Sequence, residues 1–306
     1  MKEFKEKVAV ITGAASGIGR GIARKAAKER MKVVLADIEK EALNQTEEEL
    51  KTSGADVISV LIDVSKSEDI ERLAQETLNA FGEVHLLCNN AGVGVPGPIW
   101  EGTLPDWEWI IGVNLWGVIH GVRTFIPIML QQDNECHIVN TSSMAGLLPG
   151  DERLGIYGVT KHGVVALSES LRASFGQLGA KIGVSVLCPG IVNTKIVNCE
   201  RNRPAEFCDP DYMNKDRLLL FEPSMERYKK NHPETEQYID LVLEMYEKGT
   251  SPDQAGDVVF EAIKNDIFYI YTELGLMWKK GMKTRFDGIL EDYNQIRYIL
   301  RDLKSK

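Results

Sequence analysis

The segment Val8-Ala-Val-Ile-Thr-Gly-Ala-Ala-Ser-Gly-Ile-Gly19 decides the fold of this chain. It joins an apolar run to a turn with three glycines, and a helix-length segment, 17–30, follows from the turn. Glycine tolerates the backbone angles of a tight turn and lets another group approach the main chain closely. A strand, a glycine-rich turn and a helix in this order predict a βα unit. The positive end of its helix dipole would hold a pyrophosphate.

Five more apolar runs follow the first, and segments long enough for a helix separate them. Apolar strands that are covered on both faces are typical of parallel sheets, and their crossovers are right-handed. The pattern therefore predicts an α/β protein with one doubly wound parallel sheet flanked by helices, and with its ligand at the carboxyl ends of the strands. The expected strands are 8–11, 33–36, 57–61, 84–88, 137–140 and 184–188.

Composition points to small-molecule partners. The chain has 306 residues, 43% of them hydrophobic and 26% charged, and a formal net charge of −9, which argues against a nucleic acid or an anionic membrane as partner. No uninterrupted apolar run reaches the roughly 20 residues that span a bilayer. The first residues lead into a strand and not into a signal-peptide core. We therefore expect a cytoplasmic protein, organised as one domain over 1–306.

The cysteine pattern predicts neither a disulfide nor a metal site. No two of the five cysteines form a C-x-x-C pair, and two lie in apolar strand-like runs, where buried thiols are common. The cysteines are Cys88, Cys136, Cys188, Cys199 and Cys208.

Asp37 ends the second expected strand, about twenty residues after the glycine turn. A carboxylate there would accept hydrogen bonds from an adenosine ribose and repel a 2′-phosphate, which favours NAD over NADP. Neither Ser16 nor Ile38 is basic, although Arg20 and Lys40 lie close enough to keep NADP as the weaker alternative. The alternative role for Asp37 is that of a helix N-cap.

Tyr157 and Lys161 lie four residues apart in Tyr-Gly-Val-Thr-Lys and would share one face of a helix. The lysine ammonium would stabilise the phenolate and lower the tyrosine pKa from its usual value of about 10 toward neutrality. That would make the phenol a usable acid-base. The spacing alone also fits an ordinary solvated helix face.

Taken together, six motifs resemble the short-chain dehydrogenase/reductase family over residues 4–195, with a further match near 251–272. The resemblance implies a Rossmann-type fold, a nicotinamide dinucleotide cofactor and a homodimer or homotetramer. The motifs are the glycine turn 12–19, Asn89-Asn-Ala-Gly92, Asn114, Ser143, Tyr157-x-x-x-Lys161 and Pro189-Gly-x-x-x-Thr194.

The resemblance also implies catalytic roles. Tyr157 would be the general acid-base, Lys161 its neighbour and a donor to the nicotinamide ribose, and Ser143 the hydroxyl that orients the substrate. The backbone carbonyl of Asn114 would hold a water beside the lysine. Without the resemblance, Asn114 would be interpreted as a residue at a helix kink.

For the cofactor, the resemblance places Asp63 and Val64 at the adenine ring, Asn90 at the ribose, and Val192 and Thr194 at the carboxamide. Strand capping is the alternative for Asp63 and Asn90, and a plain turn for the Pro-Gly pair. Pattern and resemblance together assign the cofactor to Gly13, Ser16, Gly17, Ile18, Gly19, Asp37, Asp63, Val64, Asn90, Gly92, Tyr157, Lys161, Pro189, Val192 and Thr194.

Two regions exceed the usual size of the family. Residues 195–250 form a long, charged insertion, interpreted as a helical substrate lid whose aromatic side chains cover an apolar substrate or form their own small core. From residue 276 to 306, helical periodicity predicts a terminal helix that packs on the body or on a partner, with core packing favoured. The lid aromatics are Phe207, Tyr212, Phe221, Tyr228, Tyr238 and Tyr246.

These features predict an NAD-dependent oxidoreductase that interconverts a secondary alcohol and a ketone. A larger lid suggests a bulky apolar substrate, such as a steroid, a bile acid or an aryl-alkanol. One alternative is an NADPH-dependent reductase of carbonyls or 3-oxoacyl thioesters. An alternative of another class is a non-catalytic dinucleotide-binding redox sensor.

Overall fold

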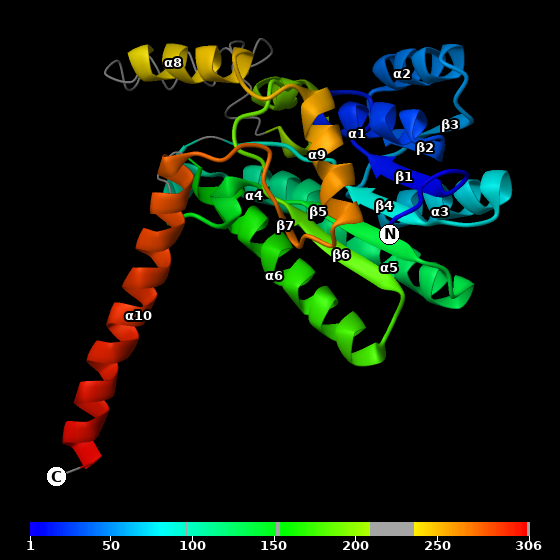
Figure 1. The fold of residues 1–306 in the computed structure, drawn as a ribbon. Coiled ribbons are helices and arrows are strands. Elements are labelled where there is room, and N and C mark those ends of the chain that lie inside the picture. Colours follow the sequence, from blue (N-terminus) through cyan, green and yellow to red (C-terminus); the bar gives the residue numbers. More distant parts are fainter. Residues whose placement is uncertain (96, 151–153, 209–235, 305–306) are drawn as a thin grey trace.

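The computed structural model describes residues 1–95, 97–150, 154–208 and 236–304. Within them, seven strands form one parallel sheet in the order β3-β2-β1-β4-β5-β6-β7 (Figure 1). The chain proceeds outward from β1 in one direction and from β4 in the other, which confirms the doubly wound topology. The strands are β1 Val8–Thr12, β2 Lys32–Asp37, β3 Val57–Leu61, β4 Leu86–Asn89, β5 Cys136–Thr141, β6 Ile182–Leu187 and β7 Tyr269–Ile270.

Most strand bounds shift by one or two residues from the expectation, and two differences can be explained. β4 begins at Leu86, and Val84 lies outside it because its N–H donates to the side chain of Gln132, at 2.9 Å, instead of to a neighbouring strand. β7 was not expected, since two residues are too short to show a periodic pattern. Its place is decided by pairing with β6, where Leu187 lies opposite Ile270.

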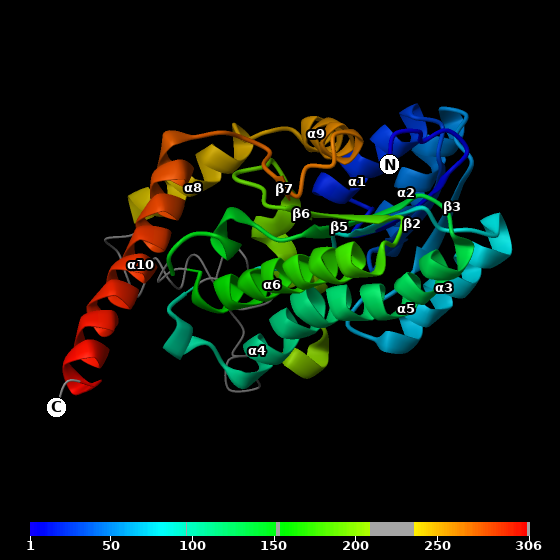
Figure 2. The same cartoon turned by 60° about the horizontal axis from the view of Figure 1, so that its bottom comes forward.

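Helices cover both faces of the sheet (Figure 2). Alternate strand residues point to opposite faces, so one core contains side chains from α1, α2 and α9, and the other contains side chains from α3, α5 and α6. The helices are α1 Gly17–Lys28, α2 Lys40–Thr52, α3 Ser67–Phe81, α4 Leu104–Ile111, α5 Gly117–Gln132, α6 Gly155–Leu178, α8 Glu236–Glu247, α9 Pro252–Lys264 and α10 Leu276–Lys304. The short helical turns are η1 Ile99–Glu101, η2 Gly112–Trp116, η3 Met144–Gly146, η4 Lys195–Asn202 and η5 Ala205–Phe207.

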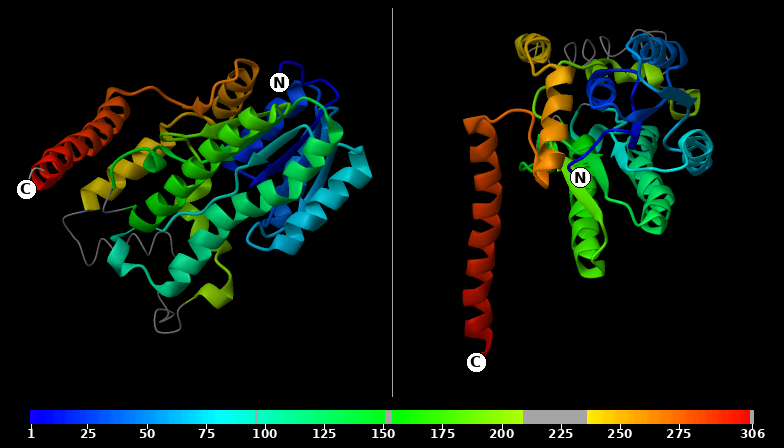
Figure 3. Two further views of the ribbon diagram at one scale, coloured as in Figure 1. Left: turned by 90° about the horizontal axis from the view of Figure 1, so that it is seen from below. Right: turned by 45° about the vertical axis from the view of Figure 1, so that its right-hand side comes forward.

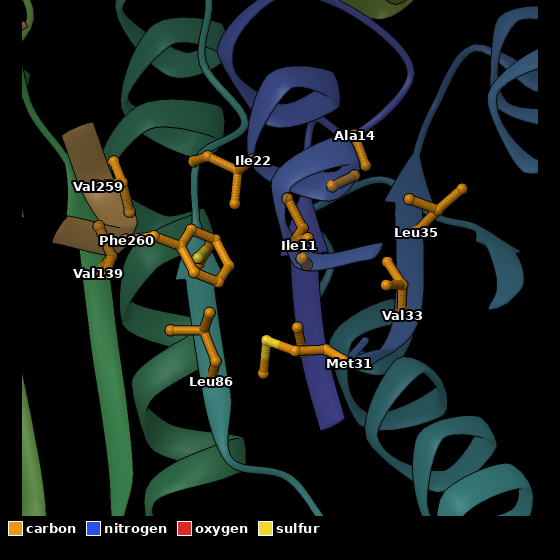
Figure 4. Close-up of a cluster of buried hydrophobic side chains, with 14 of the residues drawn as sticks. Ile11, Ala14, Ile22, Met31, Val33, Leu35, Leu86, Val139, Val259 and Phe260 are labelled. Carbon is orange, nitrogen blue, oxygen red and sulfur yellow. The ribbon is translucent and has the colours of Figure 1, made fainter. Parts of the chain in front are cut away.

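The first core holds the glycine turn in place. Ile11 of β1, Ile22 of α1 and Phe260 of α9 are fully buried and converge there (Figure 4). Burial of a large apolar side chain contributes about 1.5–3 kcal/mol, so these contacts hold α1 firmly against β1. The N-terminus of α1 is thereby directed at the edge of the sheet where the strands end.

From Leu104 to Gln132 the chain is one long helix, in which the π-helical turn η2 joins α4 to α5. By length and composition alone this stretch could cross a membrane. Core helices pass the same test, and α5 buries Phe125 and Met129 against the sheet. The expectations of no membrane partner and of a cytoplasmic location stay predictions.

A short β-bridge outside the sheet holds the two ends of the 195–250 insertion together. Val192 pairs with Thr250, and the Thr250 N–H donates to the carbonyl of Ile191 at 3.0 Å. In its described part, the insertion contains η4, η5 and α8. Of the lid aromatics, Tyr212, Phe221 and Tyr228 lie outside the described residues, as does the side chain of Tyr238.

The terminal helix forms as expected, but core packing was the wrong prediction for most of it. α10 leaves the body after its first turns and extends away from it (Figure 3). Phe286, Ile289 and Tyr293 are 54%, 54% and 69% exposed. Helical periodicity identifies an apolar face, but it does not say whether the same chain covers that face.

Candidate active site

The expected site residues meet in one cleft at the carboxyl ends of the strands, where the sheet order reverses between β1 and β4. Its cavity volume is about 290 Å³. Two expected residues, Gly19 and Asn114, are not in its lining. The expected residues that line it are Gly13, Ser16, Gly17, Ile18, Asp37, Asp63, Val64, Asn90, Gly92, Ser143, Tyr157, Lys161, Pro189, Val192 and Thr194.

The glycine turn is shaped to receive a diphosphate. Gly13 and Gly17 have positive φ angles of +65° and +51°, which side chains other than glycine rarely adopt. A methyl group on Gly19 would lie 2.1 Å from the carbonyl oxygen of Gly13, so this glycine is needed for close packing behind the turn. The first turn of α1 has no acidic residue that would oppose an anion at the helix N-terminus.

Asp37 lies at the end of β2 with its carboxylate in the cleft. One carboxylate oxygen accepts from the Ala15 N–H at 2.9 Å and the other from the Glu39 N–H at 3.0 Å. Burial raises its pKa, and these hydrogen bonds oppose the rise. Each carboxylate oxygen has a second lone pair for a ligand hydroxyl. The N-cap of α2 is Glu39, so the alternative role of Asp37 as that cap is wrong.

Beside Asp37, an ion pair that the sequence analysis missed joins the lid to the cofactor side of the cleft. The Glu39 carboxylate accepts from Arg201 Nε at 3.2 Å and from Asn202 Nδ2 at 3.0 Å, and Arg201 Nη2 forms a second contact. Although burial opposes the change, these donors lower the pKa of Glu39. All three residues line the cleft. Glu39 is only two positions from Asp37, but its partner is 162 residues away.

Asp63 and Asn90 line the cleft and also make structural contacts: Asp63 caps the turn that follows β3, and Asn90 links the end of β4 to that of β1. Asp63 Oδ1 accepts from the Ser65 N–H at 2.9 Å, and Asn90 Nδ2 donates to the Thr12 carbonyl at 3.0 Å. The Thr141 hydroxyl donates to Asn90 Oδ1 at 3.3 Å. The capping alternative therefore describes real contacts, and it is compatible with a ligand at the same residues.

Tyr157 stands in the first turns of α6, and its side chain is hydrogen-bonded to Ser143. The neighbouring Ser142 instead donates to the Lys161 carbonyl at 2.8 Å. Burial raises the pKa of Tyr157, with a smaller opposing contribution from Ser143. The expected lowering of this pKa by Lys161 is therefore wrong for the protein's own residues, because burial has the larger effect.

Lys161 is 2% exposed, and its ammonium lies 5.5 Å from the centre of the Tyr157 ring. Nζ donates to the Thr141 carbonyl at 3.0 Å. Burial lowers the lysine pKa to about 8. The pair therefore does not lie on a solvated helix face. The fold places a phenol and an ammonium together inside the cleft wall.

Asn114 lies one layer behind the cleft, in the π-helical turn η2. Its Oδ1 accepts from the Val93 N–H at 2.8 Å, and its Nδ2 donates to the Val93 carbonyl at 2.9 Å and to the Thr160 hydroxyl at 3.1 Å. Asn114 thus lies at a local irregularity of the long helix, a π-helical turn, and the interpretation as a residue at a kink stays a prediction. The expected role of the Asn114 backbone carbonyl in holding a water stays a prediction.

Apolar side chains form the part of the cleft next to Tyr157. They include Val93, Val95 and Trp109 of the body and Tyr246 of the lid. Phe207, also from the lid, packs on the same cluster of side chains. This arrangement favours an apolar substrate over a charged one.

The five cysteines are free, and four of them are buried. Cys199 lines the cleft, where its thiol donates to the Gly94 carbonyl at 3.2 Å and burial raises its pKa to about 12. Among the residues that the structure describes, no three histidine, cysteine or acidic side chains are grouped to hold a metal ion. The expectation of no metal stays a prediction.

Known proteins resemble the chain over nearly its whole length. The sequence profile described as short chain dehydrogenase matches residues 7–205. A CLA biosynthesis dehydrogenase/reductase of Lactiplantibacillus plantarum is 36% identical over 276 residues, 89% of this chain and 90% of that protein. A C alpha-dehydrogenase of Sphingobium sp. strain SYK-6 is 32% identical over 294 residues, 95% of this chain and 88% of that protein. A Burkholderia phymatum short chain dehydrogenase/reductase in complex with NAD has a TM-score of 0.83 and 40% identity, covering 95% of this chain and 97% of that one.

Proposed function

The chain belongs to the short-chain dehydrogenase family, and on this premise we propose that it uses NAD to interconvert a secondary alcohol and a ketone in a bulky apolar substrate. Family membership makes it an oxidoreductase of CH–OH groups with a dinucleotide cofactor. The observation that supports the finer proposal most is the arrangement of the half-buried Tyr157 and Ser143 with the buried Lys161 beside the glycine turn, in one cleft.

In this proposal Tyr157 exchanges the proton of the alcohol. Ser143 is hydrogen-bonded to the phenol and would hold the substrate oxygen beside it. Since burial raises the tyrosine pKa, the phenolate needs positive charge nearby. Lys161 provides one such charge at 5.5 Å from the ring centre. Oxidised NAD supplies the hydride acceptor and a second positive charge when bound.

The residues of the cleft fit a dinucleotide. The glycine turn and the N-terminus of α1 would hold the diphosphate, and Asp37 the adenosine ribose. Thr194, whose methyl group lies against the position where Gly17 would carry a side chain, would hold the nicotinamide end with Val192. Asp37 supports NAD over NADP because its charge opposes a 2′-phosphate.

NADP remains the second candidate, because two cations, Lys195 and Arg201, line the same cleft. Arg201 is paired with Glu39, which adds another negative charge near Asp37. A non-catalytic redox sensor is disfavoured, since it does not require the Tyr157, Ser143 and Lys161 arrangement.

Replacement of Tyr157 by phenylalanine tests the proposal. With NAD and a panel of steroid, bile acid and aryl-alkanol substrates, we expect turnover to fall by about 10²–10⁴-fold, because a positioned acid-base contributes about that factor. The dissociation constant for NADH, measured by fluorescence, should stay within about threefold of the wild-type value, because the phenyl ring keeps its packing. Near-normal turnover by the variant would overturn the assignment of Tyr157, and a wild-type chain that binds NADH without oxidising any alcohol would support a sensor.

A further inference from the structure

The terminal helix α10 carries a line of apolar side chains spaced alternately by four and three residues. This is the heptad period of a coiled coil, in which one edge of a helix faces another helix. Past its first member, each side chain in the line is 52–69% exposed. This line, the α10 seam, consists of Met282, Phe286, Ile289, Tyr293, Ile296, Leu300 and Leu303.

The seam continues a face that already packs on the body. Trp278 donates its indole N–H to Glu273 at 2.8 Å, Met282 packs on the core beneath α6, and Arg285 donates to the Leu147 carbonyl at 3.1 Å. Figure 3 shows α10 extending away from the body, and the exposed members of the seam begin at Phe286. The face that starts as a packed surface therefore continues from 286 to 303 with no cover from the described residues.

The rest of the helix surface suits solvent. Leu290 and Ile299 flank the seam and widen it, and between residues 284 and 301 Tyr298 is the one large apolar exception away from it. The remaining positions between residues 284 and 301 that point away from the seam are polar or glycine, namely Thr284, Asp287, Gly288, Glu291, Asn294, Gln295 and Arg301. Such one-sided patterning is typical of a helix that meets one partner helix.

Charges beside the seam identify a second copy as a fitting partner. In a parallel, in-register coiled coil, the position just before a seam residue that opens a three-residue step, here Phe286, Tyr293 or Leu300, lies next to the position five residues later on the other helix. This places Asp292 of each chain beside Arg297 of the other, so the symmetric pair has two complementary contacts. The same register covers all six exposed members of the seam at once.

We propose that α10 is an assembly helix whose seam pairs, parallel and in register, with the seam of α10 in a second copy of this chain. The proposal is independent of the reaction, because the seam does not reach the cleft. It makes the seam a contact surface additional to any contact between the bodies of the subunits.

A cysteine on the seam tests the pairing in the full chain. Under mild oxidation, Tyr293→Cys should form a covalent dimer at least about tenfold faster than Gln295→Cys, because a disulfide needs Cα atoms about 4.4–6.8 Å apart. Gln295→Cys is the matched control, since it is also in α10 but points away from the seam. The wild-type chain measures the background from its five native cysteines. Equal rates for the two variants, or no dimer above the background, would overturn the proposal.

A charge exchange then identifies the partner and its direction. In the Tyr293→Cys background, Asp292→Arg should slow cross-linking by about fivefold, because it places two arginines together. Adding Arg297→Asp should restore the rate, since each helix then carries the exchanged pair. Restoration requires that the partner bear both residues in parallel register. Failure of the double variant to recover would exclude that register and point to an antiparallel pair, another protein or a membrane, any of which overturns the proposal.

Discussion

At the scale of single residues, the Glu39–Arg201 pair is the contact most relevant to cofactor choice. Its side chains are 23% and 26% exposed, and it lies in the cleft beside Asp37. While Arg201 is bound to Glu39, its guanidinium is not free for a 2′-phosphate. The pair can therefore strengthen the preference for NAD that Asp37 alone would give.

Replacement of Glu39 by glutamine tests this role. The change removes one negative charge and releases Arg201, so NADPH should bind about tenfold more tightly, with NADH affinity within about threefold of the wild type. Titration of intrinsic fluorescence gives both dissociation constants. The double variant Glu39→Gln/Arg201→Ala is the control and should lose the gain. An unchanged NADPH affinity in Glu39→Gln would show that the pair has no part in specificity.

The pKa of Lys161 predicts a dependence of stability on pH. Burial lowers this pKa from 10.5 to about 8 in the folded chain. Between these values the unfolded chain binds more protons, so this residue makes the free energy of unfolding rise as pH increases from about 8 to about 10.5. Lys161→Met should remove that rise, which amounts to about 3 kcal/mol at most.

Urea unfolding of the wild type and Lys161→Met at pH 7 and at pH 10, without cofactor, measures the effect. The relevant quantity is the difference in free energy of unfolding between the two proteins at each pH. The buried cysteines also titrate in this range when the chain unfolds, and they do so in both proteins. A difference that does not change with pH would contradict a lysine of lowered pKa.

At the scale of elements, the crossing of α1 and α9 fixes the glycine turn from behind. A methyl group on Gly21 would lie 1.9 Å from the Pro252 carbonyl oxygen, and one on Gly256 would lie 2.5 Å from that of Gly21. Backbone atoms cannot move aside as a flexible side chain can. The two helices therefore approach closely because both carry glycine at the crossing.

Gly21→Ala should destabilise the chain by about 1–3 kcal/mol or more through overpacking, and it should also weaken NADH binding because α1 carries the glycine turn. Gly176→Ala in α6 is the matched control, since no atom lies within 4 Å of the added methyl group. The control should be neutral or stabilising by up to about 1 kcal/mol. Thermal unfolding and NADH titration give both quantities. A Gly21→Ala chain as stable as the control would rule out the close crossing.

At the scale of the whole molecule, Arg203 fastens the start of the lid to the body. Its guanidinium contacts Asp106 at 2.8 Å and Glu200 at 2.6 Å, and it lies 4.2 Å from the centre of the Trp109 ring. The side chain is 7% exposed, so the pair with Asp106 is buried. Removal of one partner from such a pair leaves an unpaired buried charge.

Arg203→Met should therefore cost about 3–5 kcal/mol of stability and raise the KM of the alcohol substrate about tenfold, with NADH affinity within about threefold. Arg203→Lys keeps the charge but not the forked contacts. Its stability and its KM should therefore lie between those of Arg203→Met and those of the wild type. Urea unfolding and steady-state kinetics provide the measurements. An unchanged KM in Arg203→Met would mean that this anchor does not hold the lid in position for the substrate.

The sequence by itself determined six of the seven strands of the sheet, the glycine turn and the sites of Asp37, Tyr157 and Lys161 on their elements. These features depend on local periodicity and on glycine backbone angles, which neighbouring residues encode. The resemblance added Ser143 and Asn114. It also led to the short-chain dehydrogenase family, which the family profile and the known relatives show.

Only the tertiary structure decided which side chains meet and how deeply they are buried. It reversed the expected shift in the Tyr157 pKa, because desolvation depends on every element around the phenol. It joined Arg201 to Glu39 across 162 residues and left the α10 seam uncovered. A periodic pattern identifies an apolar face, but contact with that face depends on where distant parts of the chain are placed.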